Sequence, residues 1–361
     1  MLKFYTDKWG VLTQPHKMGQ ELYPPFKEAL KSVYQLLGAS DDDSIVMTSS
    51  GAEAINHAIL STYQDISLNE GKNHFITLAN EEAPILMSFH RLNALGAATA
   101  VLKPDSQGLM TPEQLIEAIT PRTCMVALSW ANGLTGVIQP IIEIAKICNL
   151  RGIRLLVEGT HVLGKLFFAL KEYPIDFFCF NGDHLHAPKG TGGLFVKQGI
   201  KLSPLIAGGM EQLGLRAGAL NVPAVVALGQ SAKQMLEARD YFCTEVARLQ
   251  LEFEKEVLKR IPQAKRLFEE SDKITGVITF SFSGITNESL LFELNQKNVF
   301  ASIGGGSLPT LSFYLKTCGF ESWIANSAIT FSLSRYTTEE EIEAAVTVIE
   351  KTVSHLSKVS L

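Results

Sequence analysis

The sequence predicts an α/β protein in which a large domain, built on a mostly parallel sheet covered by helices, precedes a smaller α+β domain. Its 361 residues exceed the roughly 100 to 200 residues of one ordinary domain. Between about residues 44 and 200, apolar runs of strand length alternate with amphipathic stretches of helix length, which is typical of a parallel sheet with helices on its faces. After residue 222 the pattern changes to a long charged helix followed by separate strands and helices. We therefore assign residues 13–235 to the large domain, and residues 1–12 and 236–361 to the small domain.

Strands of the large domain are predicted where apolar residues run without interruption, because strands buried on both faces read as continuous apolar segments. In chain order these segments are IVMTS (45–49), HFITLA (74–79), TAVLK (99–103), CMVALSW (124–130), IRLLVE (153–158), FFCF (177–180) and GGLFV (192–196). The stretches between them carry apolar residues at spacings of three and four, which predicts helices. Ligands of such sheets bind beyond the carboxyl ends of the strands, where we expect Ser49, Trp130, Glu158 and Asn181.

A long helical pattern over about residues 222–261 joins the small domain to the large one. The small domain continues through ITGVITFSFSG, ESLLFELNQKN and AITFSLSRY to a final helix from Thr337 to about Ser357. That last segment opens with threonine and three glutamates, which stabilise the start of a helix.

Composition excludes several classes of protein. The 32 basic and 37 acidic residues are interspersed and give a net charge of −5, so we expect no nucleic-acid partner. The opening residues lack the apolar stretch of a signal peptide, and no run approaches the roughly 20 apolar residues of a membrane span, so we expect no membrane partner and a cytoplasmic location. The five cysteines are scattered without a CxxC pair, which favours buried free thiols over disulfides or zinc.

The segment TSSGAEAIN (48–56) follows a strand and opens a helix. Backbone amides at the start of a helix favour an anion such as phosphate, and the small residues Ser50, Gly51 and Ala52 allow close approach. A tight turn with an ordinary helix cap is the alternative interpretation.

Two later segments concentrate titratable groups at the same edge of the sheet. Glu158 ends a strand and His161 follows it, so this carboxylate is available to a protonated ring nitrogen or a metal, although an ion-paired surface glutamate is equally consistent. The segment FCFNGDHLHAPKGTGGLFV adds five polar residues after the next strand: Asn181, Asp183, His184, His186 and Lys189.

From about Ser44 to Leu356, the chain resembles the class V aminotransferase family of pyridoxal-phosphate fold-type I, and within it the cysteine desulfurases. The resemblance rests on TSSGAEAIN, ANGLTGVIQPI, LLVEGTHVLGK, FNGDHLHAPKGTGGLFV, GLRAGALNVPAVVALG and ITFSLSRYTTEEEIE. It implies the fold-type I architecture and a homodimer in which Arg216 of GLRAGALN approaches the neighbouring chain. It also implies cofactor contacts at Ser50, Gly51, Ala52, Glu82, Asn132, Glu158, His161, Asn181 and Asp183.

The positions that perform the family's chemistry carry other residues. His184 stands where the resemblance implies the Schiff-base lysine, and an imidazole cannot form a stable imine. Lys189 matches a different family position. Glu82 replaces the histidine that stacks on the pyridine ring.

The remaining positions complete the comparison with the family pattern. Glu158 replaces the family's aspartate as a longer acid, His161 replaces a glutamine, and Asn132 is retained. The loop that carries the desulfurase cysteine reads Gly304, Gly305 and Gly306 here, with Gly306 in place of the thiol. Thr330 replaces the arginine that clamps the substrate carboxylate, and one hydroxyl cannot supply its bidentate fork; Arg335 matches a later, structural arginine.

Several hypotheses follow. The first is a degenerate homologue that lacks desulfurase activity and binds a small ligand or a protein partner. The second is an enzyme that holds pyridoxal or pyridoxamine phosphate without covalent attachment and uses His184 as the base. The third is a metal site formed by Glu158, His161, Asp183, His184 and His186. An ordinary cofactor-dependent enzyme is the remaining alternative.

Overall fold

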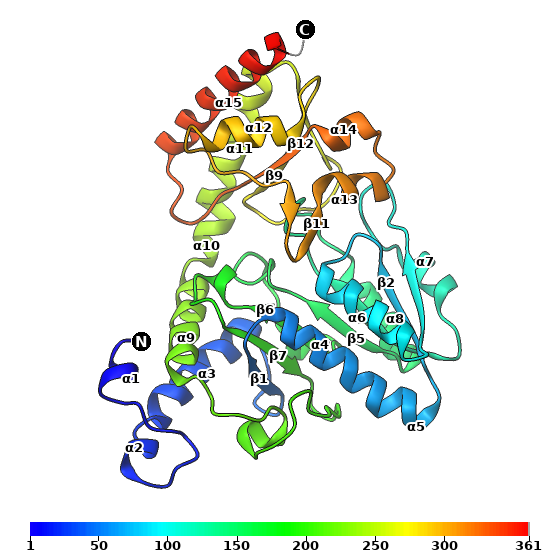
Figure 1. Ribbon diagram of the computed structural model, residues 1–361, viewed down its shortest axis with the longest axis vertical. Coiled ribbons are helices and arrows are strands. Elements are labelled where there is room, and N and C mark those ends of the chain that lie inside the picture. Colours follow the sequence, from blue (N-terminus) through cyan, green and yellow to red (C-terminus); the bar gives the residue numbers. More distant parts are fainter. Residues whose placement is uncertain (360–361) are drawn as a thin grey trace.

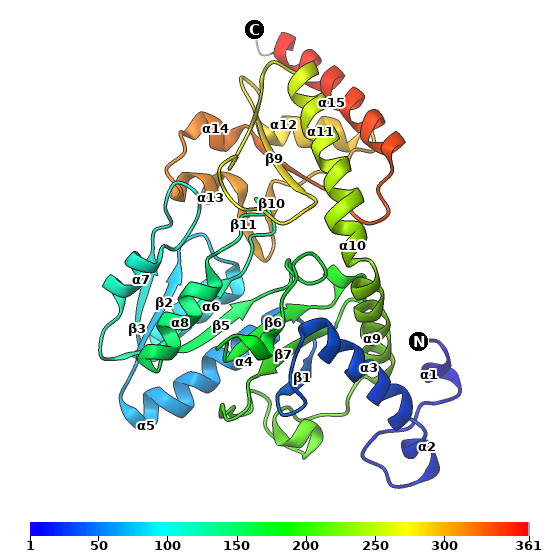
Figure 2. The ribbon, with the colours of Figure 1, turned by 180° about the vertical axis from the view of Figure 1, so that it is seen from behind.

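The computed structural model describes residues 1–359 and has two layered parts joined by a helical column (Figures 1 and 2). The larger part is a seven-stranded sheet in the order β1-β7-β6-β5-β4-β2-β3. Six strands are parallel, and only β7 runs against both of its neighbours. The mixed α/β fold is therefore confirmed. The strands are β1 (Ser44–Thr48), β2 (His74–Leu78), β3 (Ala98–Leu102), β4 (Thr123–Ser129), β5 (Arg154–Glu158), β6 (Phe177–Asn181) and β7 (Gly192–Val196).

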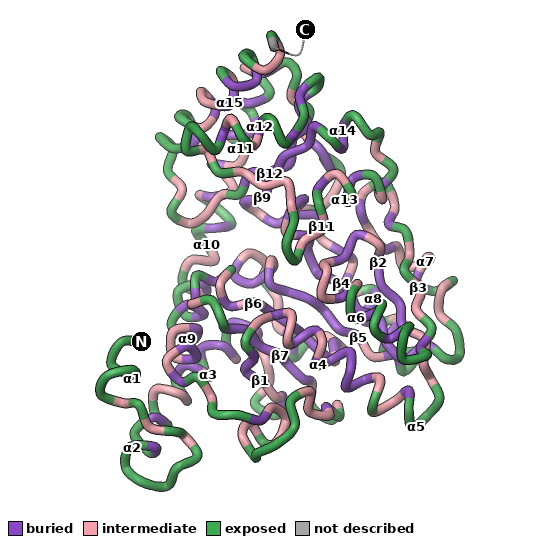
Figure 3. The backbone as a smooth tube through the Cα atoms, in the orientation of Figure 1, coloured by how far each residue is buried: buried purple, intermediate pink, exposed green. Residues whose placement is uncertain are grey.

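Helices cover both faces of this sheet, because successive side chains of a strand point to opposite faces. In β4, Val126 and Leu128 join one apolar cluster with α3, α7, α8 and α9, whereas Met125 and Ala127 join another with α4 and α6. Figure 3 shows the central strands of the sheet as buried, whereas the edge strand β3 is partly exposed. The helices of this part are α1 (Lys3–Thr6), α2 (Lys17–Gln20), α3 (Tyr23–Leu37), α4 (Gly51–Thr62), α5 (Leu68–Glu70), α6 (Ala83–Ala94), α7 (Pro112–Ala118), α8 (Ile141–Arg151) and α9 (Val222–Glu237).

The smaller part is an antiparallel sheet in the order β12-β9-β8, packed against three helices through Phe253 of α11, Leu290 of α12 and Val346 of α15. A hairpin of β10 and β11 extends from it toward the large sheet (Figure 1). Its elements are α11 (Ala247–Arg260), β8 (Ala264–Arg266), β9 (Val277–Phe282), α12 (Asn287–Asn295), β10 (Gly304–Gly305), β11 (Leu308–Thr310), α13 (Leu311–Thr317), α14 (Ser322–Asn326), β12 (Ala328–Ser332) and α15 (Glu339–Val359).

The column between the two parts is the long helix expected at 222–261, but it is interrupted. After α9 come the short α10 (Arg239–Tyr241) and a π-helical turn, Phe242–Val246, before α11 begins. Buried residues up to Val246 pack with the large sheet, and those from Leu249 onward pack with the small one. The π turn thus lies where the buried face changes from one core to the other.

The N-terminal segment lies beside α9, far from the small sheet in Figure 1. Phe4 of α1 packs with Leu22 and Val222. We assigned residues 1–12 to the small domain; in the structure, Phe4 contacts the first residue of α9.

A loop after β4 fastens the two parts together. The carbonyl oxygen of Leu134 accepts hydrogen bonds from the hydroxyls of Thr279 in β9, at 2.9 Å, and Thr330 in β12, at 2.7 Å. The amide of Ile274 donates to the carbonyl of Gly136 at 2.9 Å. Two strands of the small sheet, β9 and β12, are therefore bonded to a loop of the large part.

All five cysteines are free thiols; Cys243 is exposed and the other four are buried. Within residues 1–359, no helix is both long and apolar enough to cross a bilayer.

Candidate functional site

A pocket of about 300 Å³ lies beyond the carboxyl ends of β5 and β6, under the β10–β11 hairpin. The hairpin is held to α6 by a 2.7 Å hydrogen bond from the amide of Ala83 to the carbonyl of Ser307. Nine of the predicted site residues meet here, while Asn132 does not. The pocket is lined by Ser50, Gly51, Ala52, Ile55, Glu82, Pro84, Glu158, Thr160, His161, Asn181, Asp183, His184, Gly305, Ser307 and Leu308.

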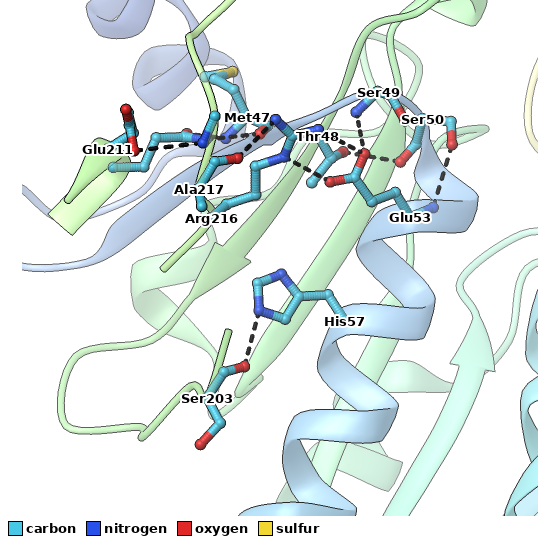
Figure 4. A network of polar contacts seen from close by, with 12 residues as sticks. Met47, Thr48, Ser49, Ser50, Glu53, His57, Ser203, Glu211, Arg216 and Ala217 are labelled. Atoms are coloured by element: carbon cyan, nitrogen blue, oxygen red, sulfur yellow. Dashed lines mark hydrogen bonds and ion pairs between the residues drawn. The ribbon is translucent and has the colours of Figure 1, made fainter. Parts of the chain in front are cut away.

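The start of α4 is bonded within the chain, as Figure 4 shows for Ser49, Ser50 and Glu53. Ser50 is the N-cap, and its hydroxyl accepts from the amide of Glu53 at 3.2 Å. The amide of Ser49 donates to the Glu53 carboxylate at 2.8 Å, and the amide of Gly51 donates to Oδ1 of Asn181 at 3.0 Å. Two of the amides expected to hold a phosphate therefore already have partners.

Arg216 completes this arrangement in its own chain. Its Nε donates to Oε1 of Glu53 at 2.9 Å, and both side chains are largely enclosed (Figure 4). Burial raises the pKa of Glu53, but the hydrogen bonds from Arg216 and Ser49 outweigh it, so the pKa is lowered. Glu53 is thus an ionised group at the helix start, where the helix dipole favours negative charge.

Glu158, at the end of β5, is 2% exposed. Its Oε1 accepts from the amide of Thr160 at 3.0 Å and from the Thr160 hydroxyl, which in turn accepts from the amide of Asn181 at 2.9 Å. Its buried Oε2 has no hydrogen-bond partner within the described residues. Burial, and then the nearby charge of Glu82, raise the pKa of Glu158 to about 8.

Glu82 and His161 face one another across the pocket. Oε1 of Glu82 lies 3.6 Å from Nε2 of His161, which is longer than a good hydrogen bond. Burial raises the pKa of Glu82 to about 7 and lowers that of His161, although the charge of Glu158 opposes the second shift. Glu82 gives the pocket a second carboxyl group.

His184 lies at the mouth of the pocket, exposed to solvent, with its ring edge-on to that of His161 at 4.8 Å between centroids. Partial desolvation and then the neighbouring His161 lower the pKa of His184 to about 4. Both imidazoles are therefore neutral at pH 7.

The metal hypothesis is wrong on geometry. No group of three or more His, Cys, Asp or Glu within residues 1–359 is arranged to hold a metal ion. His186 has a left-handed backbone (φ 63°), and its ring lies against Tyr336. Asp183 pairs with the exposed Lys189 at 3.6 Å through Oδ2, while its buried Oδ1 has no partner in that range.

Other residues from the sequence analysis lie outside the pocket. Oδ1 of Asn132 accepts from the amides of Leu134 and Thr135 in its own turn, at 2.9 and 3.0 Å. The Thr330 hydroxyl donates a hydrogen bond to the carbonyl oxygen of Leu134. Trp130, expected at the crevice, is buried in the core against Phe168.

Sequence reasoning missed two residues beside the pocket. Thr160 links the ends of β5 and β6 through its bonds to Glu158 and Asn181. The only sequence signal for that role is its position two residues after Glu158. Lys165 packs over the ring of Phe242 at 5.8 Å and has no ion pair within residues 1–359. Burial lowers the pKa of Lys165 to about 8, and its charge lowers the pKa of His161 and His184.

The fold and the pocket at its strand ends define a protein of the class-V aminotransferase type, and the comparisons agree. The family profile described as aminotransferase class-V matches residues 1–345, so the chain belongs to that family. It is 31% identical to the cysteine desulfurase NifS of Azotobacter vinelandii, over 100% of this chain and 90% of that protein. It is 32% identical to a cysteine desulfurase of Nostoc sp., with the same coverage.

Solved structures are similar across the whole chain. A NifS-like protein superposes with a TM-score of 0.91 at 26% identity, over 98% of this chain and 94% of that one. SspA in complex with cysteine superposes with a TM-score of 0.80 at 25% identity, over 93% and 94%. The recognised resemblance and the fold-type I architecture are therefore confirmed.

The family implies pyridoxal phosphate, and one feature of the pocket suits it: Oε2 of Glu158 lacks a partner and would accept a bond from a protonated ring nitrogen. The other features do not. No lysine lines the pocket, a carboxyl group replaces the expected aromatic platform at Glu82, and the amides of Ser49 and Gly51 are already bonded. The residues present do not fit pyridoxal phosphate.

Proposed function

We propose that this chain is a class V aminotransferase-family protein without desulfurase activity, which keeps the family scaffold to bind a small ligand in the pocket under the β10–β11 hairpin. The observation that carries the proposal is the pocket lining. Among the described residues that line it there are three carboxyl groups and two imidazoles, and no Lys, Arg or Cys. The tether, the sulfur nucleophile and the carboxylate clamp that the family resemblance implies are all replaced, at His184, Gly306 and Thr330.

The existing thiols do not supply the missing nucleophile. The thiolate is the reactive form of cysteine, and burial raises the pKa of Cys124 to about 11 and those of Cys148 and Cys318 to about 12. Burial also raises the pKa of Cys179. Cys243 is exposed, but it lies on the helical column and does not line the pocket.

The experiment is to incubate the purified chain with pyridoxal phosphate and cysteine and to measure sulfide release and visible absorbance. Borohydride treatment and peptide mass spectrometry would follow. We expect no sulfide and no pyridoxyl-lysine. An adduct on any lysine, with Lys165 the first to inspect, would overturn the proposal.

A second outcome would favour the non-covalent enzyme. Pyridoxamine phosphate retained through dialysis by the parent chain, and lost by His184→Ala, would support His184 as a base, since its pKa of about 4 keeps the ring neutral. Equal retention by the variant would exclude that role.

We also propose that the chain is a homodimer. The segment Ile206–Gly218 supports this, because Gln212 anchors it to Met47 while Met210 and Leu213 are exposed at 82% and 84%. Large apolar patches on a protein surface often mark an interface with another protein.

A further inference from the structure

We propose that the pocket binds a small organic cation with N–H donors, such as a guanidinium, an amidinium or a protonated nitrogen heterocycle, and does not bind a phosphorylated ligand. The inference rests on the proposed function, because it names the ligand class of the same pocket. Three observations carry it. Carboxyl oxygens in the pocket wall lack partners, the start of α4 is partly occupied by the chain's own side chains, and the pocket lining contains carboxyl groups but no Lys or Arg among the described residues.

Some carboxyl oxygens of the pocket wall are bonded to no donor among the described residues. Glu158 is buried, and its Oε2 has no partner within residues 1–359; the same is true of Oδ1 of Asp183. The side-chain carboxyl of Glu82 has only the 3.6 Å contact to His161 within residues 1–359. A buried acceptor left unpaired costs about 1–3 kcal/mol, so a ligand that brings N–H groups gains by satisfying them.

The anion site at the start of α4 is partly occupied by the chain itself. An incoming phosphate would have to displace Asn181 from the amide of Gly51, and it would meet the Glu53 carboxylate that the amide of Ser49 already holds. Glu53 is also held by Arg216 at 2.9 Å, so this nearby cation is already paired. This interpretation is independent of the acceptors in the pocket wall.

Once its carboxyl groups are ionised, the pocket favours a cation. Its lining has carboxyl groups at Glu82, Glu158 and Asp183, and its two imidazoles have lowered pKa values. The nearby cations lie outside the lining: Lys189 is 92% exposed and pairs with Asp183, and Lys165 packs on Phe242. The titratable groups that face the site from every side are Glu81, Glu82, Glu158, His161, Lys165, Asp183, His184 and Lys189.

The volume and the lining of the pocket favour a planar cation with a small apolar part. A planar cation with several N–H groups can bond to two carboxylates at once, which a compact ammonium does less well. The volume of about 300 Å³, with apolar walls from Ile55, Pro84 and Leu308, leaves room for a ring or a short alkyl chain.

Binding of such a cation should release protons. Burial raises the pKa of Glu82 to about 7 and that of Glu158 to about 8, so the empty pocket holds protons at neutral pH. A permanently charged cation favours the ionised carboxylates, and its affinity should therefore rise as the pH increases from 6 to 8.5.

The test is calorimetric titration of the full chain with methylguanidinium, and with its neutral isostere methylurea, at pH 6 and pH 8.5. Inorganic phosphate and pyridoxal phosphate are titrated in parallel. We expect methylguanidinium to bind at least about tenfold more tightly than methylurea, and about tenfold more tightly at the higher pH. Glu158→Gln should weaken binding by about tenfold. Glu82→Gln should have a similar effect, and it replaces the first variant in the test if circular dichroism shows that Glu158→Gln folds poorly. The exposed Glu117→Gln is the matched control and should bind as the parent does.

The inference is overturned if methylguanidinium shows no saturable binding, if methylurea binds equally well, or if either phosphate compound binds more tightly. These outcomes are separate from those of the sulfide and borohydride assays. Tight pyridoxal phosphate binding without a lysine adduct or sulfide would remove the cation site and leave the proposed lack of desulfurase activity standing.

Discussion

At the scale of single residues, the most unusual feature is the burial of two neighbouring carboxyl groups without a cation in the pocket lining. Glu158 and Glu82 both have raised pKa values because burial penalises their charged forms. Thr160 satisfies one oxygen of Glu158 and leaves the other unpaired. The folded chain therefore binds protons that the unfolded chain releases.

This predicts how stability depends on pH. The pKa of Glu158 rises from its ordinary value of 4.5 to about 8 on folding, so the folded state binds more protons between these values. Stability is then greatest below pH 4.5 as far as this group is concerned, and it is lost as the pH rises toward 8. In Glu158→Gln, urea denaturation at pH 5 and pH 8.5 should show a smaller loss than in the parent. An equal loss in both proteins would contradict the raised pKa.

Glu53 shows what sequence reasoning reached and what it did not. TSSGAEAIN correctly predicted a helix start at the strand ends, with Ser50 and Gly51 at the pocket. The pattern could not reveal that Arg216 holds Glu53, or that Asn181 bonds to the amide of Gly51, because these partners lie 163 and 130 residues apart in the chain. Partners so distant in sequence are fixed by the tertiary fold.

At the scale of elements, all seven predicted strands of the large sheet are present, because continuous apolar runs leave little ambiguity when both faces are buried. The break in the long helix at Phe242–Val246 was not predictable. Its cause is that the helix passes from one core to another, and no local spacing of apolar residues encodes that passage. The resemblance places Gly304, Gly305 and Gly306 in a loop, but Gly304 and Gly305 are paired in the hairpin.

The hairpin gives a prediction with an internal control. Gly304 and Gly306 both have left-handed backbones, but a Cβ at Gly304 would lie 2.2 Å from the carbonyl oxygen of Pro309, whereas one at Gly306 would meet nothing within 4 Å. Gly306→Ala should cost about 1 kcal/mol in unfolding free energy, for the backbone alone. Gly304→Ala should cost at least about 1 kcal/mol more, because of the steric overlap. Urea denaturation of both variants measures the difference, and equal costs would argue against a closely packed hairpin.

At the scale of the whole molecule, the proposed dimer depends on the segment Ile206–Gly218. Gln212 anchors this segment to β1 with two hydrogen bonds to the backbone of Met47, at 2.6 and 3.0 Å. Gln212 and Leu213 both have positive φ values, which is an uncommon conformation for residues other than glycine. The anchored segment projects Met210 and Leu213 outward, and sequence resemblance alone could not show that they are presented in this way.

We expect light scattering coupled to gel filtration to give the mass of two chains. Leu213→Asp should shift the population toward the monomer, because it places a charge in an apolar interface. Leu150→Asp, at a leucine on α8 that is 83% exposed, is the control and should leave the mass unchanged. A monomeric parent chain would remove the dimer proposal and would not affect the pocket.

The double threonine bond to the carbonyl of Leu134 has a consequence for how a ligand enters and leaves. Because β9 and β12 are both tied to the same loop of the large sheet, we expect the two halves to resist swinging apart on that side of the cleft. We expect the pocket to open instead at the β10–β11 hairpin, whose turn residue Ser307 accepts a hydrogen bond from the amide of Ala83. The residence time of a ligand in the pocket should therefore depend on movement of this hairpin, while its equilibrium affinity is set by the carboxyl groups beneath.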